Sequence, residues 1–289
     1  MKRILLFLIA LITLNPVNAQ RLKAYQIYNK AEDSVSFEDM VNALSHYDVV
    51  LFGELHNNSI IHWLELSTEK ALYRIKGNKL IAGAEMFERD NQNALDRYLE
   101  DSTDAGELNK EARLWPNFET DYKPLVDFAK ENHLRFIATN IPRRYASYVA
   151  KNGLDTLADL PDNEKTYMAD MPIDIDMATP GYKEMIDMIK EHAGDKAMNF
   201  VAAQAVKDAT MAASITGNWK RKHLFLHFNG DYHSKEYGGI YWYLKKEKKR
   251  LKVAVISIAE SDQLQLPLPE NFIPTDFNIV VPADMTKTY

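Results

Sequence analysis

The sequence has 289 residues, a formal net charge of −6 at neutral pH and 46% hydrophobic residues. This length allows one large buried core, and the mildly acidic balance argues against the basic surface that nucleic-acid binding requires, so we expect no nucleic-acid partner. The sequence has no cysteine, which excludes disulfides, thiolate metal ligands and a lipid-bearing cysteine. Any metal or cofactor must be held by His, Tyr, Met, Asp or Glu.

Residues 1–19 have the features of a secretory signal peptide. Lys2-Arg3 gives a positive start, Ile4–Leu14 is an apolar run, and small residues precede a cleavage site after Ala19. The apolar run is shorter than the about 20 residues that span a bilayer, and no later segment approaches that length. We therefore expect residues 20–289 to be exported, periplasmic or secreted, with no stable membrane span and no lipid anchor. The alternative is an uncleaved membrane anchor.

Short apolar runs alternate with helical patterns along the rest of the chain. Most of the runs are apolar throughout, which is typical of parallel strands buried on both faces. This alternation predicts an α/β fold with a mostly parallel central sheet flanked by helices. The predicted strands are Val49–Phe52, Leu80–Ala84, Arg135–Thr139, His223–Phe228, Val253–Ile258 and Phe277–Val281, and the predicted helices include Ile60–Ile75, Gln92–Glu100 and Pro124–Asn132.

Residues 155–197 differ from this pattern because they contain no strand-like run and are rich in Asp, Pro and Met. We interpret them as a helical lid inserted into a single α/β domain that spans residues 20–289. Methionine is flexible and polarizable, so a Met-rich lid suits an adaptable apolar surface. The alternative is that these methionines only fill gaps within a helical subdomain.

Polar residues follow four of the predicted strands at the points where the strands end. Because the carboxyl ends of parallel strands share one edge of a sheet, where ligands commonly bind, we expect these residues to converge. Two of the strand ends form Gly-x-x-His turns, in which glycine permits a positive φ or a close backbone approach. The alternative is that one or both histidines only satisfy a turn. The expected cluster is Gly53, Glu54, His56, Glu85, Arg143, Arg144, Gly230, Asp231 and His233.

An alanine-rich helix is predicted at Ala202–Ala212. Its residues Gln204, Asp208 and Met211 share one face by their spacing, and the alanines allow a flat partner to approach closely. The alternative is a packed helix whose polar stripe faces solvent. Among the other histidines, His62 is near enough to His56 to face the site, whereas His227 lies inside a strand and is expected to be a hydrogen-bonded core residue.

At these motifs the chain resembles the ChaN-like haem-binding uptake family, in the superfamily that includes the Tiki proteins, TraB-like proteins and erythromycin esterases. The resemblance covers roughly residues 45–260. It implies a mixed α/β core with a helical lid and a haem site. The matching stretches are Gly53–His56, Ala84–Arg89, Asn140–Arg143, Gln204–Ala212 and Asn229–His233.

The first functional hypothesis is an exported protein that binds haem and takes part in haem or iron uptake in the cell envelope. Haem requires an apolar slot, an axial ligand such as His, Tyr or Met, and cations for its propionates. Tyr182, Tyr232 and His233 are the alternatives for the axial ligand, and a homodimer that buries the cofactor is compatible with this hypothesis. The predicted haem-binding set is His56, Arg143, Arg144, Tyr182, Gln204, Asp208, Met211, Tyr232 and His233.

The second hypothesis is a hydrolase of esters or peptides, because hydrolase members of the superfamily use these motifs for metal-dependent or acid–base hydrolysis. The resemblance assigns such catalysis to Glu54, His56, Glu85 and His233, with Arg143 as the oxyanion stabiliser. A divalent transition metal would be held by His56, Glu85 and His233. Whether the chain is an enzyme stays open. A third hypothesis is a binding protein for another small planar or anionic ligand.

Overall fold

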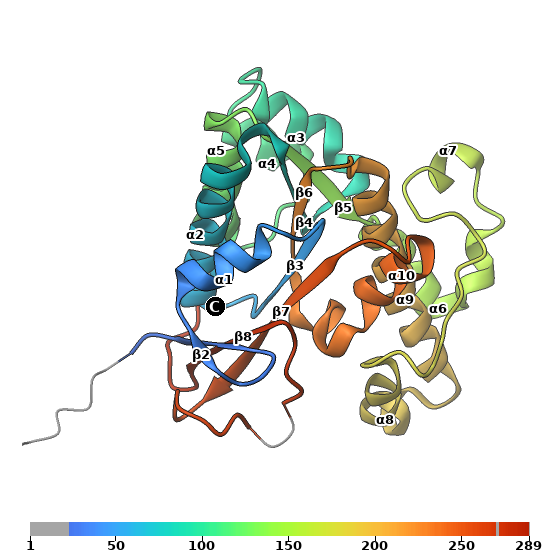
Figure 1. The fold of residues 1–289 in the computed structure, drawn as a ribbon. Helices are drawn as coiled ribbons and strands as arrows, with labels where there is room; N and C mark the ends of the chain where they lie inside the picture. The colour runs from blue at the N-terminus through green and yellow to red at the C-terminus, as the bar shows by residue number, and fades with distance from the viewer. Residues whose placement is uncertain (1–22, 270–271, 289) are drawn as a thin grey trace, which may run out of the picture.

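The computed structural model describes residues 23–269 and 272–288, so the predicted signal peptide lies outside the described residues. Within the described residues, an eight-stranded sheet with the strand order β2-β1-β8-β7-β3-β6-β4-β5 lies between two layers of helices (Figure 1). This arrangement confirms the predicted α/β class. No helix in the described part of the chain is both long and apolar enough to cross a membrane.

The centre of the sheet is parallel, as the apolar runs predict. All six predicted strands are present, and most extend one to four residues beyond their predicted ends: β3 (Val49–Glu54), β4 (Leu80–Glu88), β5 (Arg135–Asn140), β6 (Leu224–Gly230), β7 (Val253–Ser261) and β8 (Phe277–Pro282). Two short strands at one edge were not predicted, β1 (Gln26–Asn29) and β2 (Ser34–Val35), which pair antiparallel with each other, and β1 also pairs antiparallel with β8.

Each face of the sheet buries a separate hydrophobic cluster, because side chains alternate between the two faces along a strand. In β3, Val50 and Phe52 pack on the first face, whereas Val49 and Leu51 pack on the second. The first face is covered by α1 (Phe37–Leu44), α2 (Ser59–Lys76), α3 (Gln92–Leu99), α4 (Ala105–Glu111) and α5 (Lys123–Glu131), and the second by α6 (Arg143–Asn152), α9 (Ala197–Asn218) and α10 (Gly239–Glu247).

The segment predicted as a helical lid, residues 155–197, is helical only in part. It contains the short α7 (Asp162–Lys165) and the longer α8 (Tyr182–Ala193), while residues 166–181 have no regular structure. Pro172 and Pro180 account for this difference, because a proline inside a helix lacks an amide donor and clashes with the preceding turn. α8 packs against the first turns of α9 through Tyr182, which contacts Val201.

The position of β6 determines which strand ends meet. The chain passes from β3 through α2 to β4 and leaves a gap between these two strands, which β6 later fills. In the resulting register Glu54 lies beside Gly230, and Ala84 lies beside Phe228. The polar residues that follow β3, β4 and β6 are therefore neighbours at one edge of the sheet, as predicted.

Candidate functional site at the carboxyl edge of the sheet

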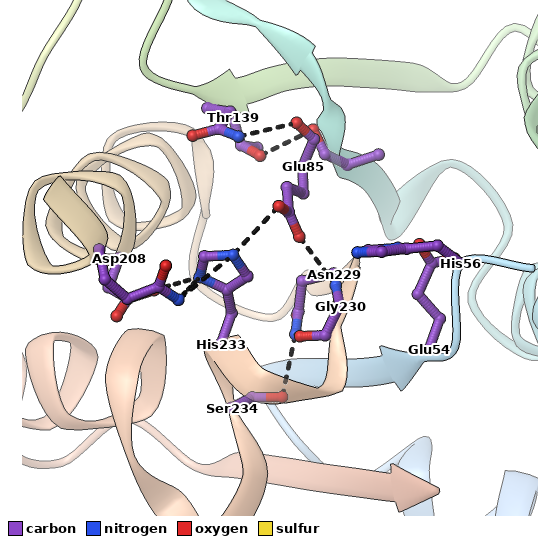
Figure 2. Close-up of polar contacts among 12 residues, drawn as sticks. Glu54, His56, Glu85, Thr139, Asp208, Asn229, Gly230, His233 and Ser234 are labelled. Carbon is purple, nitrogen blue, oxygen red and sulfur yellow. Dashed lines mark hydrogen bonds and ion pairs between the residues drawn. The ribbon is translucent and has the colours of Figure 1, made fainter. Parts of the chain in front are cut away.

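A buried histidine between two carboxylates forms the centre of the site. The Nε2 atom of His233 lies 3.1 Å from Oε1 of Glu85, and its Nδ1 atom contacts the carboxylate of Asp208 on α9. The other oxygen of Glu85 accepts a hydrogen bond of 2.8 Å from the Gly230 amide. Figure 2 shows the Glu85 side chain reaching between His233 and Gly230. Residues of β4, β6 and α9 thus hold one another in a single arrangement.

Two further predicted residues complete this cluster from the helical side. The Nε2 atom of Gln204 lies 2.9 Å from Nδ1 of His233. The hydroxyl of Tyr182, at the start of α8, donates a 2.8 Å hydrogen bond to Asp208. The predicted face of the alanine-rich helix therefore meets the second Gly-x-x-His turn at Gln204 and Asp208. Met211 lies farther along α9 and is fully buried in the hydrophobic cluster of the second face.

Electrostatics keep His233 positively charged at neutral pH. Burial alone would lower its pKa, but the negative charges of Glu85 and Asp208 outweigh this effect and raise the pKa to about 10. Burial would likewise raise the pKa of Glu85, but the charge and hydrogen bond of His233 hold it well below its ordinary value. The centre is thus an imidazolium ion paired with an ionised carboxylate.

His56 lies on the other side of Gly230 from His233 (Figure 2). A Cβ atom on Gly230 would come within 2.7 Å of Cε1 of His56, so only glycine lets the imidazole ring pack on this backbone. The Nδ1 atom of His56 lies 2.5 Å from Oε1 of Glu54, and Trp115 packs against the ring at a centroid distance of 4.9 Å. These contacts fix the ring while its side chain stays 38% exposed.

Gly53 is also required by a close approach and not by a positive φ. A Cβ atom there would lie 2.4 Å from Oδ1 of Asp231. This carboxyl group accepts a 3.3 Å hydrogen bond from the amide of Ile258, and burial raises its pKa to about 7. The glycine of each Gly-x-x-His turn therefore makes room for a side chain of the other turn.

Glu54 points to the opposite face of the sheet from Glu85. It belongs to the same alternating set as Val50 and Phe52, and there its Oε1 atom accepts a 2.9 Å hydrogen bond from the hydroxyl of Tyr122. His62 on α2 lies beneath it, 3.4 Å from Oε2 of Glu54. His62 therefore contacts Glu54 and the backbone of His56 from the face opposite Glu85, and it does not reach the cluster around His233.

The three residues whose side chains lie close enough to bind one metal ion are not the three that were predicted. Among the described residues, Glu54, His62 and Glu65 bring three ligand atoms together, whereas His56, Glu85 and His233 do not form such a group. Both ring nitrogens of His233 already face carboxylates. Glu65 was missed, although its spacing of three residues from His62 on a predicted helix signals a shared face. Tyr122 was also missed, and no sequence pattern marks it.

The remaining predicted residues lie at the surface or in the core. Arg143 and Arg144 are exposed at the start of α6, where Arg144 binds Asp90 at 2.6 Å. The Tyr232 side chain is 38% exposed, and the Nζ atom of Lys235 lies 4.0 Å from the centroid of its ring. His227 is fully buried between Thr139 and Asn229, which confirms the prediction of a hydrogen-bonded core residue.

An α/β sandwich with two Gly-x-x-His turns around a buried carboxylate defines the class to which this chain belongs. The sequence model of the family described as haem-binding uptake, Tiki superfamily, ChaN matches residues 40–244. This match covers more than half of the chain, so the chain belongs to that family. The comparison confirms the resemblance found in the sequence.

Comparison with solved structures finds one with the same fold and others with lower similarity. A structure described as cofacial haem binding to ChaN of Campylobacter jejuni is 18% identical, covers 89% of this chain and 96% of its own, and superposes with a TM-score of 0.67. The type III effector HopBA1 is 16% identical, with coverages of 85% and 93% and a TM-score of 0.45. An erythromycin esterase mutant, EreC in its open conformation, is 12% identical, with coverages of 90% and 83% and a TM-score of 0.45. No curated protein matches the sequence.

Proposed function

We propose that this protein binds haem as part of haem or iron uptake, with Tyr232 as the axial ligand. Membership of a haem-binding uptake family supports the ligand class. The observation that carries the assignment of the ligand is the exposure of Tyr232, which is 38%, beside the buried pair of Glu85 and His233. Phenolate oxygen is an established axial ligand of haem iron.

The two alternative axial ligands are already engaged within the protein. Tyr182 is 2% exposed, and its hydroxyl donates to Asp208. Both ring nitrogens of His233 face carboxylates, and its raised pKa opposes the loss of the proton that iron ligation requires. Iron ligation by either residue would require these buried contacts to break, whereas ligation by Tyr232 leaves them intact.

Exposed apolar surface on α9, a groove along α8 and the cation of Lys235 beside Tyr232 support a flat ligand in this part of the protein. Phe200 is 44% exposed and lies one turn before Gln204 on the face of α9 that reaches His233. A groove of about 710 Å³ runs along α8. Its lining includes Glu184 but not Tyr232, and Glu184 pairs with Lys235 at 3.0 Å. This volume is within the range of cofactor sites. Lys235 supplies a cation for a propionate, and bound haem would supply the iron.

A hydrolase remains the second candidate, but the protonation state of the site disfavours histidine as its base. A general base works best with a pKa near the working pH. The pKa of His233 is raised to about 10, and that of His56 is also raised despite the opposing effect of burial, because Glu54 binds it. At neutral pH His233 therefore donates a proton better than it accepts one, and the raised pKa of His56 acts in the same direction.

A haemin titration of the protein starting at Gln20 tests the proposal. We expect a saturable shift of the Soret band at one haem per chain. We expect the Tyr232→Phe variant to lose the phenolate-to-iron charge-transfer band and to bind haemin at least about tenfold more weakly. Tyr148→Phe, a change at another exposed tyrosine, is the matched control and should behave as the wild type. A flat titration of the wild-type protein would reject haem binding, and equal spectra for the two variants would reject the assignment of Tyr232.

The proposal includes export, which the features of residues 1–19 support. Expression with this segment in a bacterial host should place the processed chain outside the cytoplasm, and N-terminal sequencing should begin at Gln20. An unprocessed chain in the cytoplasmic fraction would reject export. Light scattering during the haemin titration measures whether haem drives the pairing of two chains.

A further inference from the structure

A second polar cluster lies beneath α2, on the face of the sheet opposite Glu85. It consists of Glu54 at the end of β3 and of His62 and Glu65 in the first half of α2, whose side chains are at most 4% exposed. Oε1 of Glu54 contacts His56 and Tyr122, but Oε2 has no hydrogen-bond partner. Oε1 of Glu65 is also buried without a hydrogen-bond partner. Unpaired buried carboxylate oxygens are costly, so this cluster requires an explanation.

The hydrogen bonding of His62 shows where its lone pair lies. Its Nε2 atom is 3.1 Å from the carbonyl oxygen of His56, which can only accept, so Nε2 carries a proton and donates it. Its Nδ1 atom faces two carboxylate oxygens, at 2.9 Å from Glu65 and 3.4 Å from Glu54. A bare lone pair facing two anionic oxygens is repulsive, and either a proton or a metal cation removes the repulsion.

The charge of the cluster suits a divalent cation. Within the described part of the chain, the ion pairs of Glu54 and Glu65 involve only histidines, and no lysine or arginine pairs with them. Glu69 lies one turn further along α2, is fully buried and has two oxygens without hydrogen-bond partners. A divalent ion next to Nδ1 of His62 would balance the charge of the carboxylates of Glu54 and Glu65.

We propose that Glu54, His62 and Glu65 form a binding site for one divalent transition-metal ion, with Zn²⁺ as the first ion to test. Zinc accepts imidazole nitrogen and carboxylate oxygen at about 2.0–2.2 Å, which places neighbouring tetrahedral ligands about 3.3 Å apart. The observed separations of 2.9 and 3.4 Å from Nδ1 of His62 bracket this value. The free Oε1 of Glu65 allows that carboxylate to bind through both oxygens.

The hydrogen bond from Nε2 of His62 to a backbone carbonyl has the form of the outer contacts that orient metal-binding histidines. The metal would also act on the edge of the sheet, because Glu54 would bind it through Oε2 and hold His56 through Oε1. The ion is therefore expected to position His56. This site involves neither Tyr232 nor His233, so its test is independent of haem binding.

Calorimetric titration of chelator-treated full chain with Zn²⁺, followed by elemental analysis, tests the proposal. We expect one tight site per chain and a rise in the melting temperature on binding. Glu65→Gln, which keeps the size of the side chain, and His62→Ala should each weaken binding by about 100-fold or more. Glu85→Gln removes a buried carboxylate of the other cluster and His46→Ala removes an exposed histidine, and both should retain the site.

The visible spectrum of bound Co²⁺ provides a second measurement that reports on the ligands directly. We expect the d–d bands in the wild type and in Glu85→Gln, and their loss in Glu65→Gln. Circular dichroism of each variant separates the loss of the site from the loss of the fold. No zinc binding by the wild type, or unchanged binding by both Glu65→Gln and His62→Ala, would overturn the proposal.

Discussion

Gly230 allows both halves of the site to meet at a single residue. Its amide binds Glu85, and its missing side chain leaves space for the His56 ring. The two histidines of the Gly-x-x-His turns therefore do not touch one another, because the Gly230 backbone and Glu85 separate them (Figure 2). At the level of the residue, the motif is a way of packing two turns together as much as a way of presenting histidines.

Replacing Gly230 with alanine should destabilise the protein by about 1–3 kcal/mol, because the new methyl group would overlap the ring of His56. Gly217→Ala is the matched control, since nothing lies within 4 Å of a Cβ atom at that exposed position of α9. Alanine there should be neutral or stabilise by up to about 1 kcal/mol, owing to its higher helix propensity. Urea unfolding measures both changes, and equal midpoints for the two variants would contradict this account.

The sequence predicts which residues belong to the site better than it predicts where their side chains point. Strand ends place Glu85 and His233 together, the family resemblance adds Asp208, and the structure shows their contacts. The sequence also placed Arg144 at the same edge, but the first turn of α6 directs it outward to Asp90. Position along a strand or helix follows from local periodicity, whereas the direction of a long side chain at a helix start depends on neighbours distant in sequence.

At the scale of the element, the outer edge of β5 is covered by a side chain instead of a strand. The amide nitrogen of Gln92 donates to the carbonyl of Phe136 at 3.0 Å, and its oxygen accepts from the amide of Ala138 at 2.7 Å. One glutamine at the start of α3 thus imitates the pairing of a further strand. Unpaired strand edges are prone to intermolecular pairing, so this contact protects the sheet.

The Gln92→Ala variant should lose about 1–2 kcal/mol of stability, because two backbone groups of β5 lose their partners. It should also aggregate faster during partial unfolding, since the edge becomes available to a second chain. Asn93→Ala, at the exposed neighbouring amide, should change neither property. Urea midpoints and light scattering at mild denaturant concentrations test the pair, and indistinguishable variants would contradict the protective role.

The strands that the sequence predicts correctly are those that are apolar throughout, because both faces of the sheet are buried at these positions. The six apolar runs all became strands, because a continuous apolar stretch of that length has few other stable environments. The strands β1 and β2 are partly exposed and are four and two residues long. β1 is held by pairing with β8, and β2 by pairing with β1. Such pairing leaves no periodic signal in a short segment, and tertiary contacts decide it.

At the scale of the whole molecule, several buried titratable groups couple folding to proton binding. The pKa of His62 is raised to about 9 and that of His233 to about 10, because nearby carboxylates outweigh the effect of burial. A histidine whose pKa is higher in the folded state than in the unfolded state stabilises the fold when it is protonated. This stabilisation is complete below the unfolded-state pKa of about 6.5 and is lost as the pH rises through the folded-state pKa. Burial raises the pKa of Asp231 to about 7, so this residue also lowers the stability of the fold as the pH rises from about 4 to 7.

Glu85 has the opposite effect at low pH, because its folded-state pKa is lowered and its contribution disappears as the pH falls below about 4.5. His227, whose pKa burial lowers to about 4, opposes the effect of Asp231 below about pH 6.5. The metal-free protein should therefore be most stable at weakly acidic pH and should lose stability steadily from about pH 6.5 to 9. Urea midpoints across this range in the presence of a chelator test the profile. The Asp231→Asn variant should show a shallower slope between pH 4 and 7, and a flat or rising wild-type profile would contradict the assignment.

The insertion of β6 between β3 and β4 has a consequence for synthesis. A nascent chain that ends before Leu224 carries both Gly53 and Glu85 but lacks the strand that joins their two edges. Contacts between segments far apart in sequence form late, because loop closure must precede them. This edge of the sheet can therefore form only after β6 has been translated, so a ligand that requires the edge cannot bind to a shorter nascent chain.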